Sequence, residues 1–174
     1  GNLFGLQYIY GTLTNSDGAD PLDYSAVMEN PAEFYMPATD AATGRATYFS
    51  KYDIVRDDYR AVMASCALPG FCRPVKVGDR YYYDGGVADS IPIIRSLKTG
   101  HRKNVIILTR NFGYRKKEGT RGWELYVAAF RKYPNLVRAL VNRAKHYNQV
   151  LECIEKWEEE GSVFVIRPEI PAVS

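Results

Sequence analysis

The chain has 174 residues, of which 46% are hydrophobic and 25% are charged, as in an ordinary globular protein with a substantial core. Its apolar runs are too short for the ~20 residues of a membrane helix. Its three irregularly spaced cysteines argue against a disulfide framework. The net charge is only +3, but segment 1–60 carries 4 basic and 9 acidic side chains, whereas 101–150 carries 12 and 2. This split indicates a basic face suited to an anionic partner.

The first part of the chain predicts loops and a hairpin. Residues 1–32 are rich in Gly, Asn, Asp and Pro and are typical of loop, with one short helix at 24–29. Two β-prone runs, 33–39 and 46–50, flank the turn-forming sequence Asp-Ala-Ala-Thr-Gly-Arg. We therefore predict a β-hairpin over 33–50.

A helix and a second hairpin are expected next. The helix covers 57–68, with Asp57 and Asp58 in a first turn whose positive dipole end favours carboxylates. Strands at 74–77 and 80–83 are joined by Gly-Asp, which is a common hairpin turn.

Helices and buried strands then alternate. A helix at 92–97 is expected to be capped by Ser90, and the apolar run 105–109 resembles strands that are buried on both faces of a parallel sheet. Residues 122–160 have a helical pattern divided by Pro134, and 163–166 forms a last buried strand. This alternation predicts an α/β fold.

The most informative stretch is an ordered series of short motifs. Ala-Ser-Cys-Ala-Leu-Pro-Gly at 64–70 precedes Pro74-Val75, then Tyr-Asp-Gly-Gly at 83–86, then Ser90-Ile91-Pro92. The series resembles the second half of the patatin-like phospholipase domain, where an Ala-Ser-x-Ala-x-Pro helix end precedes a hairpin, Asp-Gly-Gly or Asp-Gly-Ala, and Asn/Ser-x-Pro.

The resemblance extends over nearly the whole chain. Segments 104–117, 131–134 and 164–168 are similar to the bacterial branch of the family. The resemblance implies that the chain is the C-terminal portion of a bacterial patatin-like lipid acyl hydrolase. The implied α/β fold is layered, with a largely parallel central sheet, and it is incomplete because the N-terminal part is absent. Residues 1–110 would then belong to the catalytic domain, and 111–174 would form a helical extension with a final strand, packed on the same domain.

The resemblance implies that Asp84 is the general base of a Ser–Asp dyad without histidine. A carboxylate at the end of a strand can accept the proton of a serine hydroxyl, and Gly85 and Gly86 permit close approach of substrate or backbone. An isolated Asp-Gly pair is more often an ordinary turn. The flanking motifs favour the catalytic interpretation.

The family's nucleophile lies in Gly-x-Ser-x-Gly, and this pattern is absent from the sequence. The nearest serine, Ser16, lies in a polar loop, and Ser65 is expected to have a packing or backbone role. We therefore expect a truncated enzyme, or less simply a pseudoenzyme, that does not hydrolyse esters by itself. The implied mechanism requires no metal or cofactor.

Arg115, Lys116 and Lys117 follow the predicted strand 105–109 and are candidates to bind a lipid phosphate or an anionic membrane surface. A solvated charged loop is the alternative. The expected partners are an acyl lipid substrate, an anionic membrane surface and the missing N-terminal segment, in the cytoplasm or at a membrane periphery. Nucleic acid is not expected, although a non-catalytic module that binds anionic lipid or nucleic acid is the second hypothesis. A regulatory protein that kept the fold without the chemistry is the third.

Overall fold

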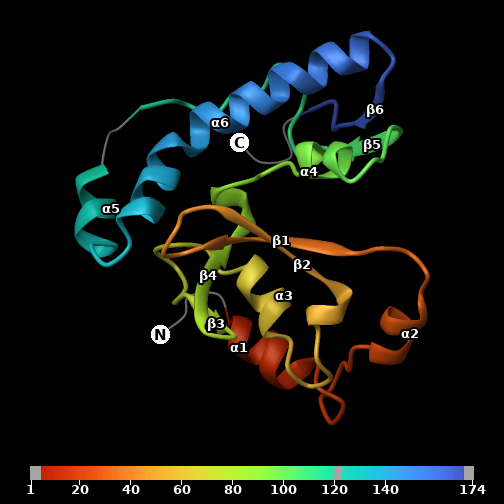
Figure 1. Ribbon diagram of the computed structural model, residues 1–174, viewed down its shortest axis with the longest axis vertical. Coiled ribbons are helices and arrows are strands. Elements are labelled where there is room, and N and C mark those ends of the chain that lie inside the picture. Colours follow the sequence, from red (N-terminus) through yellow and green to blue (C-terminus); the bar gives the residue numbers. More distant parts are fainter. Residues whose placement is uncertain (1–4, 120–122, 171–174) are drawn as a thin grey trace. The chain divides into compact units, whose positions relative to one another are not determined.

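The computed structural model describes residues 5–119 and 123–170, which group into two compact units. Figure 1 shows the chain with its elements labelled. The first unit contains the described residues 5–90 and 123–141, and the second contains 91–119 and 142–170. The predicted division of the chain at residue 110 stays a prediction.

The first unit contains a four-stranded antiparallel sheet. Its strands are β1 (Tyr35–Asp40), β2 (Ala46–Ser50), β3 (Val75–Val77) and β4 (Arg80–Asp84), in the order β2-β1-β4-β3. Both predicted hairpins are confirmed, and β1 joins them by pairing with β4 so that Ala38 lies opposite Asp84.

The α/β class is confirmed, but a largely parallel central sheet is not. Short turns connect only antiparallel neighbours, whereas a parallel pair needs a long crossover. The two hairpins therefore impose the antiparallel direction on two of the three strand pairs of the described sheet, and the third pair, β1 with β4, is antiparallel as well.

Short helices accompany this sheet. They are α1 (Leu6–Tyr8), the π-helix η1 (Ile9–Leu13), α2 (Tyr24–Glu29), α3 (Arg60–Ser65), α5 (Trp123–Ala129) and the 3₁₀ turns η2 (Lys51–Asp53) and η3 (Gly85–Val87). The predicted helix at 24–29 is confirmed, and it begins where the Asp23 carboxylate accepts the Ala26 N–H. Helix α3 packs on the sheet through Ala61 and Ala64, which are buried in the same core as Tyr82.

Helix α3 is shorter than the predicted 57–68. Asp57 has a φ of 61°, in the left-handed region that a right-handed helix cannot include. Its carboxylate instead accepts the N–H and hydroxyl of Ser16 at 2.6 and 2.7 Å. The helix therefore begins at Arg60, and Asp57 holds a loop instead of lying in the first helical turn.

The second unit is built on a parallel strand pair. Strands β5 (Asn104–Ile107) and β6 (Val163–Ile166) pair in parallel, and the long helix α6 (Pro134–Glu159) lies between them in the chain. Helix α6 belongs to this unit from residue 142 onward, and its first turns belong to the first unit. Helix α4 (Ile93–Lys98) precedes β5. The predicted helix start at Pro134 and the bounds of the last strand are confirmed. The predicted burial of that strand is wrong, because Phe164 and Ile166 are 65% and 46% exposed.

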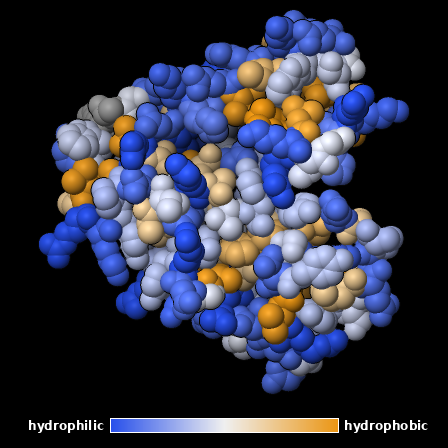
Figure 2. Space-filling model, viewed as in Figure 1, coloured by the Kyte–Doolittle hydropathy of each residue, from blue (hydrophilic) through white to orange (hydrophobic). Residues whose placement is uncertain are grey.

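Strand β5 is not buried on both faces. Ile106 lies in a core with Val163 and Ile154 of α6, whereas Val105 and Ile107 are 65% and 73% exposed. Figure 2 shows apolar residues at the surface over this part of the molecule. The apolar run therefore indicated a strand correctly but not its burial, because only one face of this pair is covered by described residues.

Ser90 does not cap α4. Pro92 occupies the N-cap position without a side-chain cap, and the Ser90 hydroxyl donates to the Gly86 carbonyl at 2.6 Å. The three cysteines are free thiols. In the described parts of the chain, no helix is both long and apolar enough to cross a lipid bilayer.

Candidate functional site

Asp84 is the last residue of β4, and its backbone is held on both sides. Its N–H donates to the Ala67 carbonyl at 2.8 Å, and its carbonyl accepts the Thr39 hydroxyl at 2.8 Å. The motif Ala-Ser-x-Ala-x-Pro therefore lies next to Asp84, because Ala67, the second residue after α3, bonds to it directly.

The Asp84 side chain begins the turn that follows. Its Oδ1 accepts the N–H of Gly86 at 2.6 Å, which caps η3. The same turn is held by Thr39, whose hydroxyl accepts the Ala88 N–H at 3.2 Å. Thr39 is completely buried, so one hydroxyl joins both ends of the Asp-Gly-Gly turn. These bonds orient a half-buried carboxylate at the end of a central strand of the sheet.

Position 85 has no room for a side chain, so it requires glycine. A Cβ at this position would lie 2.3 Å from the carbonyl oxygen of Pro37 in β1. The predicted close approach of another backbone is therefore present at Gly85. The Ser65 hydroxyl donates to the same carbonyl at 2.7 Å, which is the backbone role expected for this serine.

Tyr83 anchors the end of β4 in the core. Its ring meets Phe130 edge to face at a centroid distance of 5.7 Å, and burial, reinforced by Tyr133 and Cys72, raises the pKa of its hydroxyl to about 12. Tyr83, directly before Asp84, is therefore fixed in the apolar core as a neutral side chain. The end of β4 thus places the polar Asp84 next to this core.

A second carboxylate of this turn was missed from the sequence. Asp89 is buried and accepts the hydroxyl of Tyr48 in β2, and its N–H donates to the Gly85 carbonyl at 2.8 Å. Nothing in the local sequence points to Tyr48, because it lies 41 residues away.

Ser16 and Asp57 form a hydroxyl–carboxylate pair, but the geometry is that of a loop contact. Both residues are exposed, and Ser16 follows a π-helix without the strand and helix of a nucleophile elbow. The hydroxyl and N–H of Ser16 lower the pKa of the Asp57 carboxyl, which makes it a weaker base. We assign this pair to the structure of the loop.

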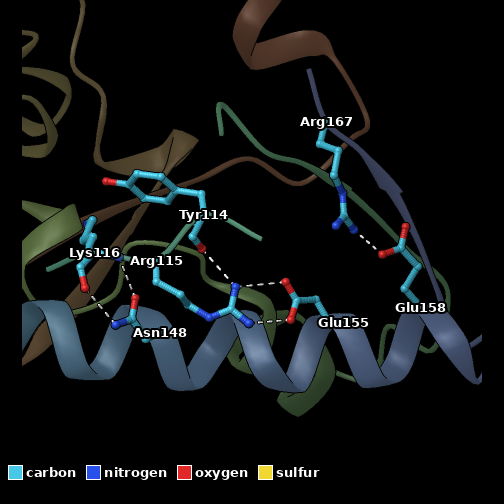
Figure 3. A network of polar contacts seen from close by, with 7 residues as sticks. All are labelled: Tyr114, Arg115, Lys116, Asn148, Glu155, Glu158 and Arg167. Atoms are coloured by element: carbon cyan, nitrogen blue, oxygen red, sulfur yellow. Dashed lines mark hydrogen bonds and ion pairs between the residues drawn. The ribbon is translucent and has the colours of Figure 1, made fainter. Parts of the chain in front are cut away.

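Two of the three predicted anion-binding residues, Arg115 and Lys116, contact helix α6, as Figure 3 shows. The Arg115 guanidinium forms a bidentate pair with Glu155 at 3.0 and 2.5 Å, and this hydrogen-bonded pairing raises the pKa of Arg115. The Lys116 ammonium lies 3.9 Å from the centroid of the Tyr147 ring. An anion at Arg115 would have to compete with Glu155.

Asn148 fixes this segment to α6. Its side-chain oxygen accepts the Lys116 N–H at 2.8 Å, and its amide donates to the Lys116 carbonyl at 3.0 Å (Figure 3). The amide also donates to Glu118 at 3.0 Å. Segment 114–118 is therefore held against helix α6 by hydrogen bonds. Lys117 is the third of the cations predicted to bind an anion.

Comparison with protein families gives two matches. Residues 28–95 match the family model described as patatin-like phospholipase. This segment of the chain is similar to patatin-like phospholipases. Residues 133–174 match a domain of unknown function, DUF6363.

The patatin-like segment includes β1 to β4, α3 and the Asp84 turn. It supports membership in a family of lipid hydrolases. Arg115, Lys116 and Lys117 lie in neither matched segment, so their proposed role receives no support from the comparisons.

Proposed function

We propose that this patatin-like chain supplies the general base, Asp84, of a serine lipid acyl hydrolase that cleaves carboxylic esters of phospholipids or other acyl lipids. The observation that carries the proposal is the Asp84 turn within the patatin-like segment. Its carboxylate is oriented by Gly86, and its backbone is held by Ala67 and Thr39. Such preorganisation is what a catalytic base needs.

In the proposed reaction, Asp84 accepts the proton of a serine hydroxyl as the serine oxygen attacks the ester carbonyl. Collapse of the tetrahedral intermediate breaks the bond to the leaving alcohol, which takes the proton from Asp84. Water, activated by Asp84 in the same way, then hydrolyses the acyl-serine and releases the carboxylic acid. The scheme uses no metal or cofactor.

The nucleophile comes from a segment outside these 174 residues, which contain no Gly-x-Ser-x-Gly. Ser65 is a poor substitute because its hydroxyl is bonded to the Pro37 carbonyl, and Ser16 lies in the loop contact with Asp57. Gly85 and Gly86 support the base and admit the substrate.

The test is hydrolysis of a short-chain p-nitrophenyl ester by the chain alone and in combination with the segment of the same gene that carries the serine elbow. We expect activity only in the combination, and a 10²- to 10⁴-fold loss of kcat with Asp84→Asn, roughly the contribution of a general base. Asp79→Asn, an exposed carboxylate in the β3–β4 turn, is the matched control and should retain activity.

Hydrolysis by the chain alone that survives Asp84→Asn would contradict the proposal and direct attention to Ser16 and Ser65. A combination that is folded but inactive towards esters would favour the binding or regulatory hypothesis instead.

A further inference from the structure

The first unit contains a cavity of about 440 Å³ that the proposed catalysis does not use. Its lining is predominantly apolar. Ile54 and Tyr59 are buried side chains of the wall, whereas Leu22 and Phe34 line it and are exposed. The cavity is therefore open to solvent beside Leu22 and Phe34, and its volume lies in the lower part of the roughly 300–1,000 Å³ range of small-molecule sites.

One charged residue in the wall is buried. Lys51 in η2 is only 6% exposed, and its ammonium donates to the carbonyls of Asn30 and Met28, the latter at 3.3 Å. Lys51 and Asn30 both line the cavity, so the ammonium lies at its wall. Among the residues that the structure describes, no carboxylate lies within 4.0 Å of this ammonium.

A buried positive charge without an ionic partner is costly unless an anion completes it. Two of the three ammonium hydrogens are used by carbonyl oxygens, and the ammonium lies 5.4 Å from the centroid of the Tyr52 ring. One N–H donor is therefore left for a hydrogen bond to a ligand. Glu33 is the one carboxylate among the residues that line the cavity; it is exposed and disfavours a ligand with two negative charges. The electrostatics therefore suit a monoanion with an apolar body.

This cavity lies at a different end of α3 from the Asp84 turn. Tyr59 and Val62, which line it, are at the start of the helix, whereas Ala67, which bonds to Asp84, follows the end of the helix. Asp84 and the glycines that follow it are not among the residues that line this cavity.

We propose that this cavity binds the anion of a single-chain fatty acid, with its alkyl chain against Ile54 and Tyr59 and its carboxylate on the Lys51 ammonium. One carboxylate matches one cation, and the volume suits a single alkyl chain. Binding requires no ester and no catalytic serine, so it is measured separately from the proposed hydrolysis.

The experiment is calorimetric titration of the full 174-residue chain with dodecanoate and decanoate below their micelle concentrations. We expect dodecanoate to bind about 15-fold more tightly than decanoate, from the burial of two more methylene groups. Lys51→Met should weaken dodecanoate binding about 10- to 100-fold by removing a charged hydrogen bond, while the neutral 1-dodecanol loses no affinity. Lys76→Met, an exposed lysine in β3 outside the cavity, should bind like the parent.

Ala32→Trp provides a variant that does not remove a buried group, because Ala32 is an exposed residue of the lining. It should abolish binding of both dodecanoate and 1-dodecanol while the circular dichroism spectrum is unchanged. Parental dodecanoate affinity in folded Ala32→Trp would overturn the proposed location. Equal binding of dodecanoate and 1-dodecanol by the parent, or tighter binding of a lysophospholipid that is indifferent to Lys51→Met, would overturn the proposed role of the ammonium.

Discussion

At the scale of single residues, Thr39 is the side chain on which the Asp84 turn most depends. Thr39→Val keeps the shape of the side chain but leaves the Asp84 carbonyl and the Ala88 N–H without this partner. We expect the free energy of unfolding to fall by about 1–3 kcal/mol, the cost of buried polar groups that lose their hydrogen bonds. Urea denaturation measures the change.

Thr12→Val is the control, because Thr12 is exposed. This substitution should change the free energy of unfolding by no more than about 0.5 kcal/mol. Equal stability of Thr39→Val and the parent would show that the turn is held without the hydroxyl.

The residues of the site differ in how far the sequence can predict them. Asp84, Gly85 and Ser65 belong to an ordered motif series that can be found in the sequence. In the fold, Gly85 and Ser65 both lie against the carbonyl of Pro37. Thr39 acts on Asp84 from 45 residues away, and no local pattern distinguishes it from any threonine in a strand.

At the scale of elements, β5 offers a direct test of which face is buried. Ile106 lies in the core of the second unit, and its neighbour Ile107 is exposed. Ile106→Ala should lower the free energy of unfolding by about 2–5 kcal/mol, whereas Ile107→Ala should change it by less than about 0.5 kcal/mol. Similar costs for the two variants would mean that both faces of the strand are covered in solution.

The β1–β2 hairpin carries a pH-dependent contact. Burial by itself would raise the pKa of the Asp40 carboxyl, but Arg80 at 2.8 Å and the N–H groups of Thr43 and Ala42 together lower it. The folded pKa thus lies below the unfolded value of about 3.9. The stabilisation is present above that value and is lost as the pH falls through the folded pKa.

We therefore expect the free energy of unfolding of the parent to fall as the pH is lowered below about 4. The fall should be less steep in Asp40→Asn. Arg80→Gln removes one of the groups that lower the pKa of Asp40, so its acid dependence should be intermediate between those of the parent and Asp40→Asn. Urea denaturation at a series of pH values measures all three proteins. The same acid dependence in Asp40→Asn and the parent would assign the effect to other carboxylates.

Elements with local causes were predicted well, and those with distant causes were not. The two hairpins follow from turn sequences between β-prone runs, and α6 begins at the proline that divides its pattern. The start of α3 depends on the contact of Asp57 with Ser16, 41 residues away. The apolar sequence of β5 gives no sign that only one of its faces would be covered.

At the scale of the whole molecule, the basic segment carries fewer available cations than its charge suggests. Arg115 is paired with Glu155, and Lys116 lies over Tyr147. Lys117→Gln should therefore weaken binding to anionic vesicles about fivefold, from about 1 kcal/mol per surface lysine, and more than Arg115→Gln does. Vesicle sedimentation at low and high salt measures this.

Unchanged vesicle binding in the double variant Lys116→Gln/Lys117→Gln would reject the membrane proposal. The pairing that weakens it was not visible in the sequence, because Glu155 lies 40 residues from Arg115 and only the folded chain brings them together.

Gly44 determines where this protein tolerates added sequence. It lies in the β1–β2 turn with a φ of 67°, and a Cβ there would lie 2.4 Å from the carbonyl oxygen of Asn135 at the start of α6. Gly78 in the β3–β4 turn has open space around it. An epitope tag, a fluorescent label or a circular-permutation site therefore belongs at the second hairpin, while the first hairpin has a turn whose length the neighbouring helix fixes.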